Sequence, residues 1–172
     1  MLFFHAVLTL FLLAVFYYDF TSYTIPNWIC GILLALYPCM LIMTPDLPDN
    51  YSIWYTLLAG VGVFAAGVVI FALRWAGGGD VKLMTVLALW AGPAQVMPFL
   101  VYTGFLGGML ALLLVMVRPI AGRMVKAEEV EKLPRILRHQ EPLPYGLAIT
   151  TSFLIILWLG YVPGLPFDYK DL

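Results

Sequence analysis

Two aspartates at the edges of apolar segments are the residues of this chain best suited to chemistry. Asp19 follows an apolar stretch that closes with Tyr17 and Tyr18, and Asp80 follows three glycines between two long uncharged runs. A carboxylate beside membrane-length apolar runs is costly unless it lies at an interface or takes part in function. The two carboxyl groups are therefore candidates for a joint function.

A close pair of carboxyl groups can hydrolyse a peptide bond. Two such groups cannot both ionise cheaply, so they share a proton. The ionised group takes a proton from a water molecule while the protonated group polarises the peptide carbonyl, and partial burial helps to hold one carboxyl neutral. The glycines before Asp80 would let an extended substrate backbone approach closely.

Each aspartate also has a plainer explanation. Asp80 is a preferred residue for a helix N-cap, and the glycines before it would then form an ordinary turn. Asp19 would be a solvated residue at a helix end, next to tyrosines of an interfacial aromatic belt. Proximity of the two side chains in the fold separates these explanations from the catalytic one.

Other catalytic and metal-binding arrangements are not indicated. His5 and His139 have no serine or cysteine partner at a recognisable motif. Cys30 and Cys39 form no C-x-x-C motif and are expected to be packing residues. No cluster of histidine, cysteine and carboxylate has the spacing of a metal site, so we expect neither a metal nor another cofactor.

The elements that must position these residues are membrane helices. The chain has 172 residues, of which 63% are hydrophobic and 11% charged, too few charges to cover a water-soluble domain. We expect one all-α transmembrane domain over residues 1–172. The fourth of its six apolar segments is short for a span of about 20 residues and is interrupted by Gly92 and Pro93, so it is expected to be enclosed by protein. The segments are 2–18, 28–44, 53–75, 83–97, 98–117 and 143–161.

The distribution of lysine and arginine predicts the orientation. If the loop 19–27 is cytoplasmic and the segments alternate, only Lys170 of the nine basic residues falls outside. Both termini then lie outside, Asp19 and Asp80 share the cytoplasmic side, and the protein is a multi-pass protein of the inner (cytoplasmic) membrane. The basic residues on the cytoplasmic side are Arg74, Lys82, Arg118, Arg123, Lys126, Lys132, Arg135 and Arg138.

The polar segment 118–141 is the longest one between apolar segments. Apolar residues recur in it at near-helical spacing with charges between them. It is either an amphipathic helix on the anionic inner leaflet or a solvated basic loop. Pro134 would break or kink a long helix here.

Three motifs resemble those of the type IV prepilin peptidases. The run from Gly77 to Met84 begins with Gly-Gly-Gly-Asp and fits the G-x-G-D motif of intramembrane aspartic proteases. Asp19 followed by Ile25, Pro26 and Asn27 resembles the family's first-aspartate motif, and the last segment opens with Pro-Tyr-Gly, as a third family motif does. The resemblance implies that Asp19 and Asp80 are the catalytic pair. It implies supporting or substrate-binding roles for Gly77, Gly79, Lys82, Pro26, Asn27, Pro144, Tyr145 and Gly146.

The resemblance also implies a substrate. Prepilin or pseudopilin precursors are cut after a glycine between a basic leader and an apolar helix, at the cytoplasmic membrane face. Large members of the family have a cytoplasmic domain with paired C-x-x-C motifs after the first span, and they also methylate the new N-terminus. This chain has only the residues 19–27 there, as in the short, peptidase-only branch that serves tight-adherence (Flp-type) pili.

Alternative functions stay open at this stage. The nearest is an archaeal-type preflagellin peptidase, and others are a transporter or proton-pathway subunit and a structural subunit of a secretion machine. A proton relay needs further polar residues at mid-membrane depth, which the segments lack, and this favours the peptidase. Lys82 has a functional explanation, in which it tunes the pair or orients substrate, and a plainer one, in which it is a snorkelling lysine. The expected partners are the precursor and the lipid bilayer, with no nucleic acid.

Overall fold

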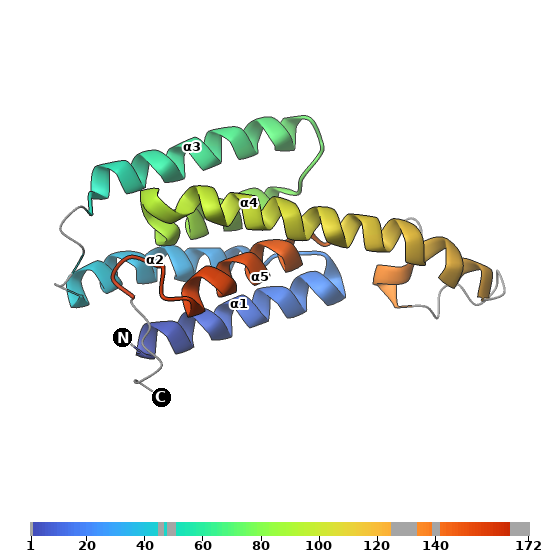
Figure 1. The fold of residues 1–172 in the computed structure, drawn as a ribbon, viewed down its shortest axis with the longest axis horizontal. Coiled ribbons are helices and arrows are strands. Elements are labelled where there is room, and N and C mark those ends of the chain that lie inside the picture. Colours follow the sequence, from blue (N-terminus) through green and yellow to red (C-terminus); the bar gives the residue numbers. More distant parts are fainter. Residues whose placement is uncertain (1, 45–46, 48–50, 125–133, 139–141, 166–172) are drawn as a thin grey trace.

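All regular elements in the part of the chain that the structure describes are helical. The computed structural model describes residues 2–44, 47, 51–124, 134–138 and 142–165. These residues form five α-helices and a short 3-10 helix (Figure 1), as predicted for an all-α protein. The elements are α1 (Leu2–Ser22), α2 (Asn27–Met43), α3 (Ile53–Ala72), α4 (Gly78–Met124), η2 (Arg135–Leu137) and α5 (Tyr145–Trp158).

The helices are those of a membrane protein. Among the described residues, α1, α3 and α4 are long and apolar enough to cross a membrane, whereas α2 and α5 are apolar but shorter. In an apolar environment the backbone must satisfy its own hydrogen bonds, which a helix does within a single segment. The structure thus supports the predicted class of protein, while the count of six spans stays a prediction.

The first helix ends later than the sequence predicts. It continues past Tyr18 to Ser22, and Tyr23 then adopts a left-handed backbone with φ of 53°. The backbone N–H of Tyr23 donates to the carbonyl of Asp19 at 3.1 Å, a bond that closes the last helical turn. Asp19 consequently lies inside the helix and not beyond its end.

The predicted boundary between the fourth and fifth segments is wrong. Helix α4 breaks at Gly92, where φ is 66° and ψ is 175°, and Pro98 lies inside its second part. Glycine adopts this φ without strain, and a proline directly after it suits the first turn of a helix, where its missing N–H is no loss. The second part runs to Met124, beyond the predicted end at Val117. The start of the polar segment 118–141 is therefore helical, whereas residues 125–133 and 139–141 lie outside the described part.

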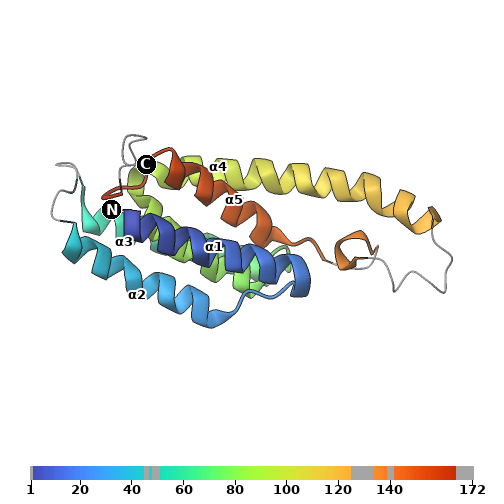
Figure 2. The same ribbon diagram turned by 90° about the horizontal axis from the view of Figure 1, so that it is seen from below.

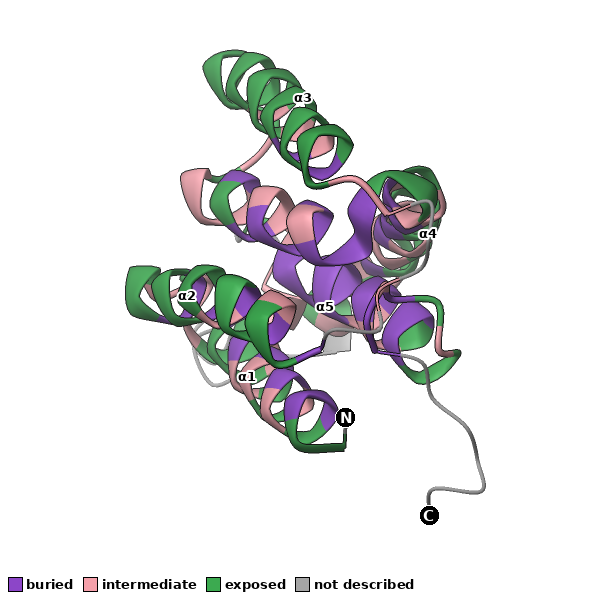
Figure 3. Cartoon of the chain, turned by 90° about the vertical axis from the view of Figure 1, so that its left-hand side faces the viewer, coloured by how far each residue is buried: buried purple, intermediate pink, exposed green. Residues whose placement is uncertain are grey.

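The buried core lies among α1, α2, α4 and α5. Leu8, Leu33, Leu87 and Phe153 are fully buried members of it. Helix α3 packs against α4 at the edge and buries only Thr56 and Gly60 (Figure 3). A Cβ on Gly60 would lie 2.5 Å from Leu89 Cδ2, so the glycine allows this close packing.

Successive helical segments run in opposite directions, so that several helix ends meet at one end of the molecule. If the two parts of α4 are taken separately, each segment reverses the direction of the one before (Figures 1 and 2). The end of α1 therefore lies beside the starts of α2, α4 and α5. This arrangement brings Asp19 and Asp80 to the same end of the fold.

Candidate active site

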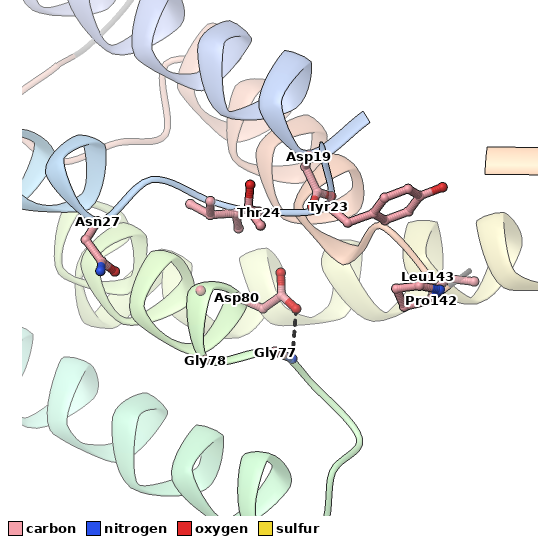
Figure 4. A pocket seen from close by; sticks show the side chains of 11 residues that line it. Asp19, Tyr23, Thr24, Asn27, Gly77, Gly78, Asp80, Pro142 and Leu143 are labelled. Atoms are coloured by element: carbon pink, nitrogen blue, oxygen red, sulfur yellow. Dashed lines mark hydrogen bonds between the residues drawn. The ribbon is translucent and has the colours of Figure 1, made fainter. Parts of the chain in front are cut away.

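A cavity of about 320 Å³ opens where these four helix ends meet. Figure 4 shows Asp19 and Asp80 approaching it from different helices, with Asp19 above and Asp80 below in that view. Both carboxyl groups belong to the lining of this one cavity. The lining residues are Asp19, Tyr23, Thr24, Ile25, Asn27, Gly77, Gly78, Gly79, Asp80, Pro142 and Leu143.

Asp19 is held by the start of α5. Its side chain in the last turn of α1 is only 4% exposed, and Oδ2 accepts a hydrogen bond from the backbone N–H of Leu147 at 3.2 Å. The N-terminus of a helix carries unpaired N–H groups and a partial positive charge, both of which favour a carboxylate. The solvated helix-end explanation of Asp19 is therefore wrong.

Gly146 gives Asp19 the space to reach this position. A Cβ on Gly146 would lie 2.7 Å from Asp19 Oδ2 and 2.8 Å from Cγ, closer than two such atoms can approach. Because Asp19 lies within α1, its short side chain cannot move far from such a Cβ. The glycine of the Pro-Tyr-Gly motif is thus a contact residue of the first aspartate.

Asp80 lies in the first turn of α4, two residues after the helix begins at Gly78. Its Oδ2 accepts a hydrogen bond from the backbone N–H of Gly77 at 3.0 Å. A first-turn side chain that reaches back to this N–H forms half of a capping box. Asp80 is thus not the N-cap residue, although its side chain does stabilise the start of the helix. The carboxyl group also lines the cavity.

The segment between α1 and α2 closes against the glycines. A Cβ on Gly79 would lie 3.2 Å from Ile25 Cβ, so the α4 start approaches this segment closely. Lys82 Nζ donates to Asn27 Oδ1 at 2.9 Å. This bond joins the starts of α2 and α4, and Pro26 is the residue directly before α2.

The third motif anchors α5. Pro144 precedes the helix, and the ring of Tyr145 packs on the second part of α4. A Cβ on Gly107 would lie 2.8 Å from Tyr145 Cε1, so this glycine makes room for the ring. Gly146 lies against Asp19, and Pro144 and Tyr145 directly precede it in the chain. None of these three residues lines the cavity, and neither do Lys82 and Pro26.

Residues 6–112, more than half of the chain, match the type IV leader peptidase family. The chain belongs to the type IV leader peptidase family. It is therefore a peptidase, and its apolar helices make it a membrane protein. No curated protein and no solved structure matches the chain.

Several residues that line the cavity of this leader peptidase lie outside the three sequence motifs. Thr24 could have been found, because it lies between Asp19 and Asn27, and so could Leu143, because it directly precedes the third motif. Tyr23 lies in the same stretch, but its left-handed backbone and the Arg135 guanidinium 5.3 Å from its ring centroid could not be predicted from the sequence.

The peptidase has no evident metal site in the described part of the chain. Among those residues, no group of three or more histidine, cysteine, aspartate or glutamate side chains could hold a metal ion. What the described cavity offers is two carboxyl groups, a wall of glycine backbone and an amide from Asn27. Such a set of groups suits proton transfer to and from a water molecule.

Proposed function

We propose that this protein is an aspartic endopeptidase that removes the leader peptide of prepilin precursors, with Asp19 and Asp80 as the catalytic pair. The observation that carries the proposal is that two aspartates 61 residues apart in sequence line one cavity of a leader peptidase family member. Apolar segments make up most of this chain, so a carboxyl pair at a shared cavity is an arrangement that packing alone does not require.

The hydrolysis needs no group beyond the two carboxyls and water. The ionised carboxylate takes a proton from water, whose oxygen attacks the carbonyl carbon of the scissile peptide. The protonated carboxyl donates its proton to the carbonyl oxygen, which gives a tetrahedral diol. The C–N bond then breaks, the amine leaves with a proton from the carboxyl that accepted one, and the hydroxyl proton returns to the other.

The glycines at the start of α4 suit a peptide substrate. Gly77, Gly78 and Gly79 line the cavity without side chains, so an extended backbone can come close to Asp80. Asn27 provides an amide to the same cavity. These groups form the supporting set that positions the scissile glycine of the precursor.

The same end of the fold is proposed to face the cytoplasm. The loop between α3 and α4, the end of α4 and η2 all lie at the cavity end (Figure 1), and they contain Arg74, Arg118, Arg123 and Arg135. Basic residues favour the cytoplasmic side of a membrane. The cavity would then open at the cytoplasmic face, with the apolar part of the precursor in the bilayer.

The short link between α1 and α2 supports a narrower assignment to the Flp-type, peptidase-only branch. Only Tyr23, Thr24, Ile25 and Pro26 separate the two helices. The cytoplasmic domain with paired C-x-x-C motifs, which large members of the family have at this point, is therefore not inserted between α1 and α2. We accordingly propose removal of the leader without methylation of the new N-terminus. An archaeal-type preflagellin peptidase remains the nearest alternative substrate assignment.

The test is cleavage by the purified protein in detergent. A Flp-type prepilin should be shortened, and the mass of the product should place the cut directly after the glycine. A preflagellin serves as the competing substrate, and S-adenosylmethionine is added to detect methylation. Failure to cut either precursor would remove the proposal, and a methylated product would contradict the peptidase-only assignment.

A further inference from the structure

Arg118 connects three segments of the chain at the cavity end. It lies in the second part of α4 and is partly buried. Its Nε donates to the carbonyl of Ile136 in η2 at 3.0 Å, and its Nη2 donates to the carbonyl of Pro142 at 3.1 Å. One side chain therefore fastens both η2 and the segment before α5 to the same helix.

The fastened segment leads directly to the first aspartate. Pro142 and Leu143 line the cavity, and Leu147, five residues after Pro142, donates its N–H to Asp19. Leu143 also lines a second pocket of about 260 Å³ together with Arg118. The segment is thus a thin wall, with the aspartate cavity on one side and the Arg118 side chain on the other.

The residue type matches this task. A guanidinium is planar and has five N–H donors in a rigid fork, so it can bind two carbonyls from separate segments at once. A lysine ammonium is a compact charge on a flexible stem and does not reproduce that geometry. From the start of η2, the Arg135 guanidinium lies over the ring of Tyr23, which follows Asp19 by about one helical turn.

We propose that Arg118 is a positioning residue, which holds the wall before α5 so that the Leu147 N–H and the Asp19 carboxyl meet at the cavity. The proposal rests on the function proposed above. The simpler alternative is that Arg118 only supplies positive charge at the cytoplasmic face. The two explanations differ in what a lysine at this position should do.

Kinetics of three variants distinguish them. We expect Arg118→Gln and Arg118→Lys each to lower kcat/KM by about ten- to a hundredfold, the range expected from the loss of charge-assisted hydrogen bonds. The loss should lie chiefly in kcat, because Asp19 acts in the chemical step. Arg123→Gln is the matched control: it removes the same charge from an exposed position on the same helix and should stay within about twofold of wild type. Wild-type activity of Arg118→Lys would overturn the proposal.

A second measurement does not depend on cleavage. In a background with Cys30→Ala and Cys39→Ala, a Leu143→Cys probe reports the position of the wall through its rate of thiol labelling. Adding Arg118→Lys should accelerate labelling, and adding Arg123→Gln should not. If the labelling rate does not change, the positioning role is refuted even where cleavage falls. If labelling accelerates although the wild type cuts no prepilin, the proposed function fails and the positioning role stands.

Discussion

At the scale of single residues, each aspartate is held by a different backbone N–H group. Asp19 takes its hydrogen bond from Leu147 at the start of α5, and Asp80 takes its bond from Gly77 just before α4. Each bond uses one oxygen of the carboxyl group. Under the proposed mechanism, the two carboxyl groups share one proton and bind the water that attacks the substrate.

We predict that Asp19→Asn and Asp80→Asn each abolish prepilin cleavage while the protein still inserts in the membrane. Asparagine keeps the size and can accept the same backbone hydrogen bonds, but it cannot cycle a proton. The loss should be at least about a hundredfold, as expected for removal of a general acid or base. The measurement is prepilin processing by membrane fractions with matched amounts of each variant.

The double variant and two other aspartates are the controls. Because the carboxyls act as one unit, Asp19→Asn with Asp80→Asn should be hardly worse than either alone. Asp46→Asn and Asp49→Asn, after α2 in the sequence, should process normally. If Asp80 served only the helix start, asparagine would replace it well, and wild-type processing by Asp80→Asn would end the aspartic-protease assignment.

Gly146→Ala should damage the site without removing any functional group. The added Cβ would lie 2.7 Å from Asp19 Oδ2, so the aspartate or the start of α5 must shift. If the overpacking cost of roughly 1–3 kcal/mol is relieved by displacing the aspartate, we expect kcat to fall about five- to a hundredfold. The control is Gly104→Ala, whose Cβ would meet no atom within 4 Å. Equal rates for the two variants would show that the close contact at Asp19 does not matter.

At the scale of the elements, the starts of α2 and α4 are joined by the hydrogen bond from Lys82 to Asn27. The sequence left two explanations for Lys82, a direct effect on the aspartates or a snorkelling lysine. Its contact with Asn27, which itself lines the cavity, favours a third. Lys82 fixes the helix that carries the second aspartate against the segment that follows the first.

A double-mutant cycle tests this link between helices. Lys82→Met and Asn27→Ala should each lower kcat/KM, and the double variant should lose less than the sum of the two effects. A hydrogen bond of this kind corresponds to a coupling of about 0.5–1.5 kcal/mol. Additive effects would mean that the two side chains act separately, and Lys82 would then be explained by its charge alone.

At the scale of the whole molecule, the alternation of helix direction gives the two ends different chemistry. The cavity end contains the aspartates and the described segments rich in arginine, whereas the opposite end contains Leu2 and the end of α5 (Figures 1 and 2). An anionic inner leaflet would favour the basic end on the cytoplasmic side. The orientation can be tested without any measurement of activity.

Single cysteines should therefore label from one side only. In a background with Cys30→Ala and Cys39→Ala, Tyr161→Cys beyond α5 should react with a membrane-impermeant reagent added to intact cells. Arg123→Cys near the end of α4 should react only after the cells are opened. Both positions are exposed in the fold. The reverse pattern would place the cavity outside the cytoplasm and would contradict the proposed site of cleavage.

Much of this protein could be predicted from its sequence, because the decisive signals are local. Long apolar runs must satisfy their backbone hydrogen bonds internally, so they form helices whatever their neighbours are. The family resemblance also depended on short motifs, and it identified the family that the chain matches. The expected approach of a substrate backbone to the glycines before Asp80 stays a prediction, and what the structure shows there is the packing of Gly79 against Ile25.

Tertiary contacts decided the rest. A solvated helix end was one explanation for Asp19. The residue is instead buried, and it accepts a hydrogen bond from the backbone N–H of Leu147, 128 residues away. Gly92 and Pro98 are both plausible helix boundaries in the sequence. Only the left-handed backbone at Gly92 shows that the helix breaks there and continues through Pro98. The roles proposed for Gly146, Lys82 and Arg118 depend on which helix ends meet, and this is set by packing between distant segments.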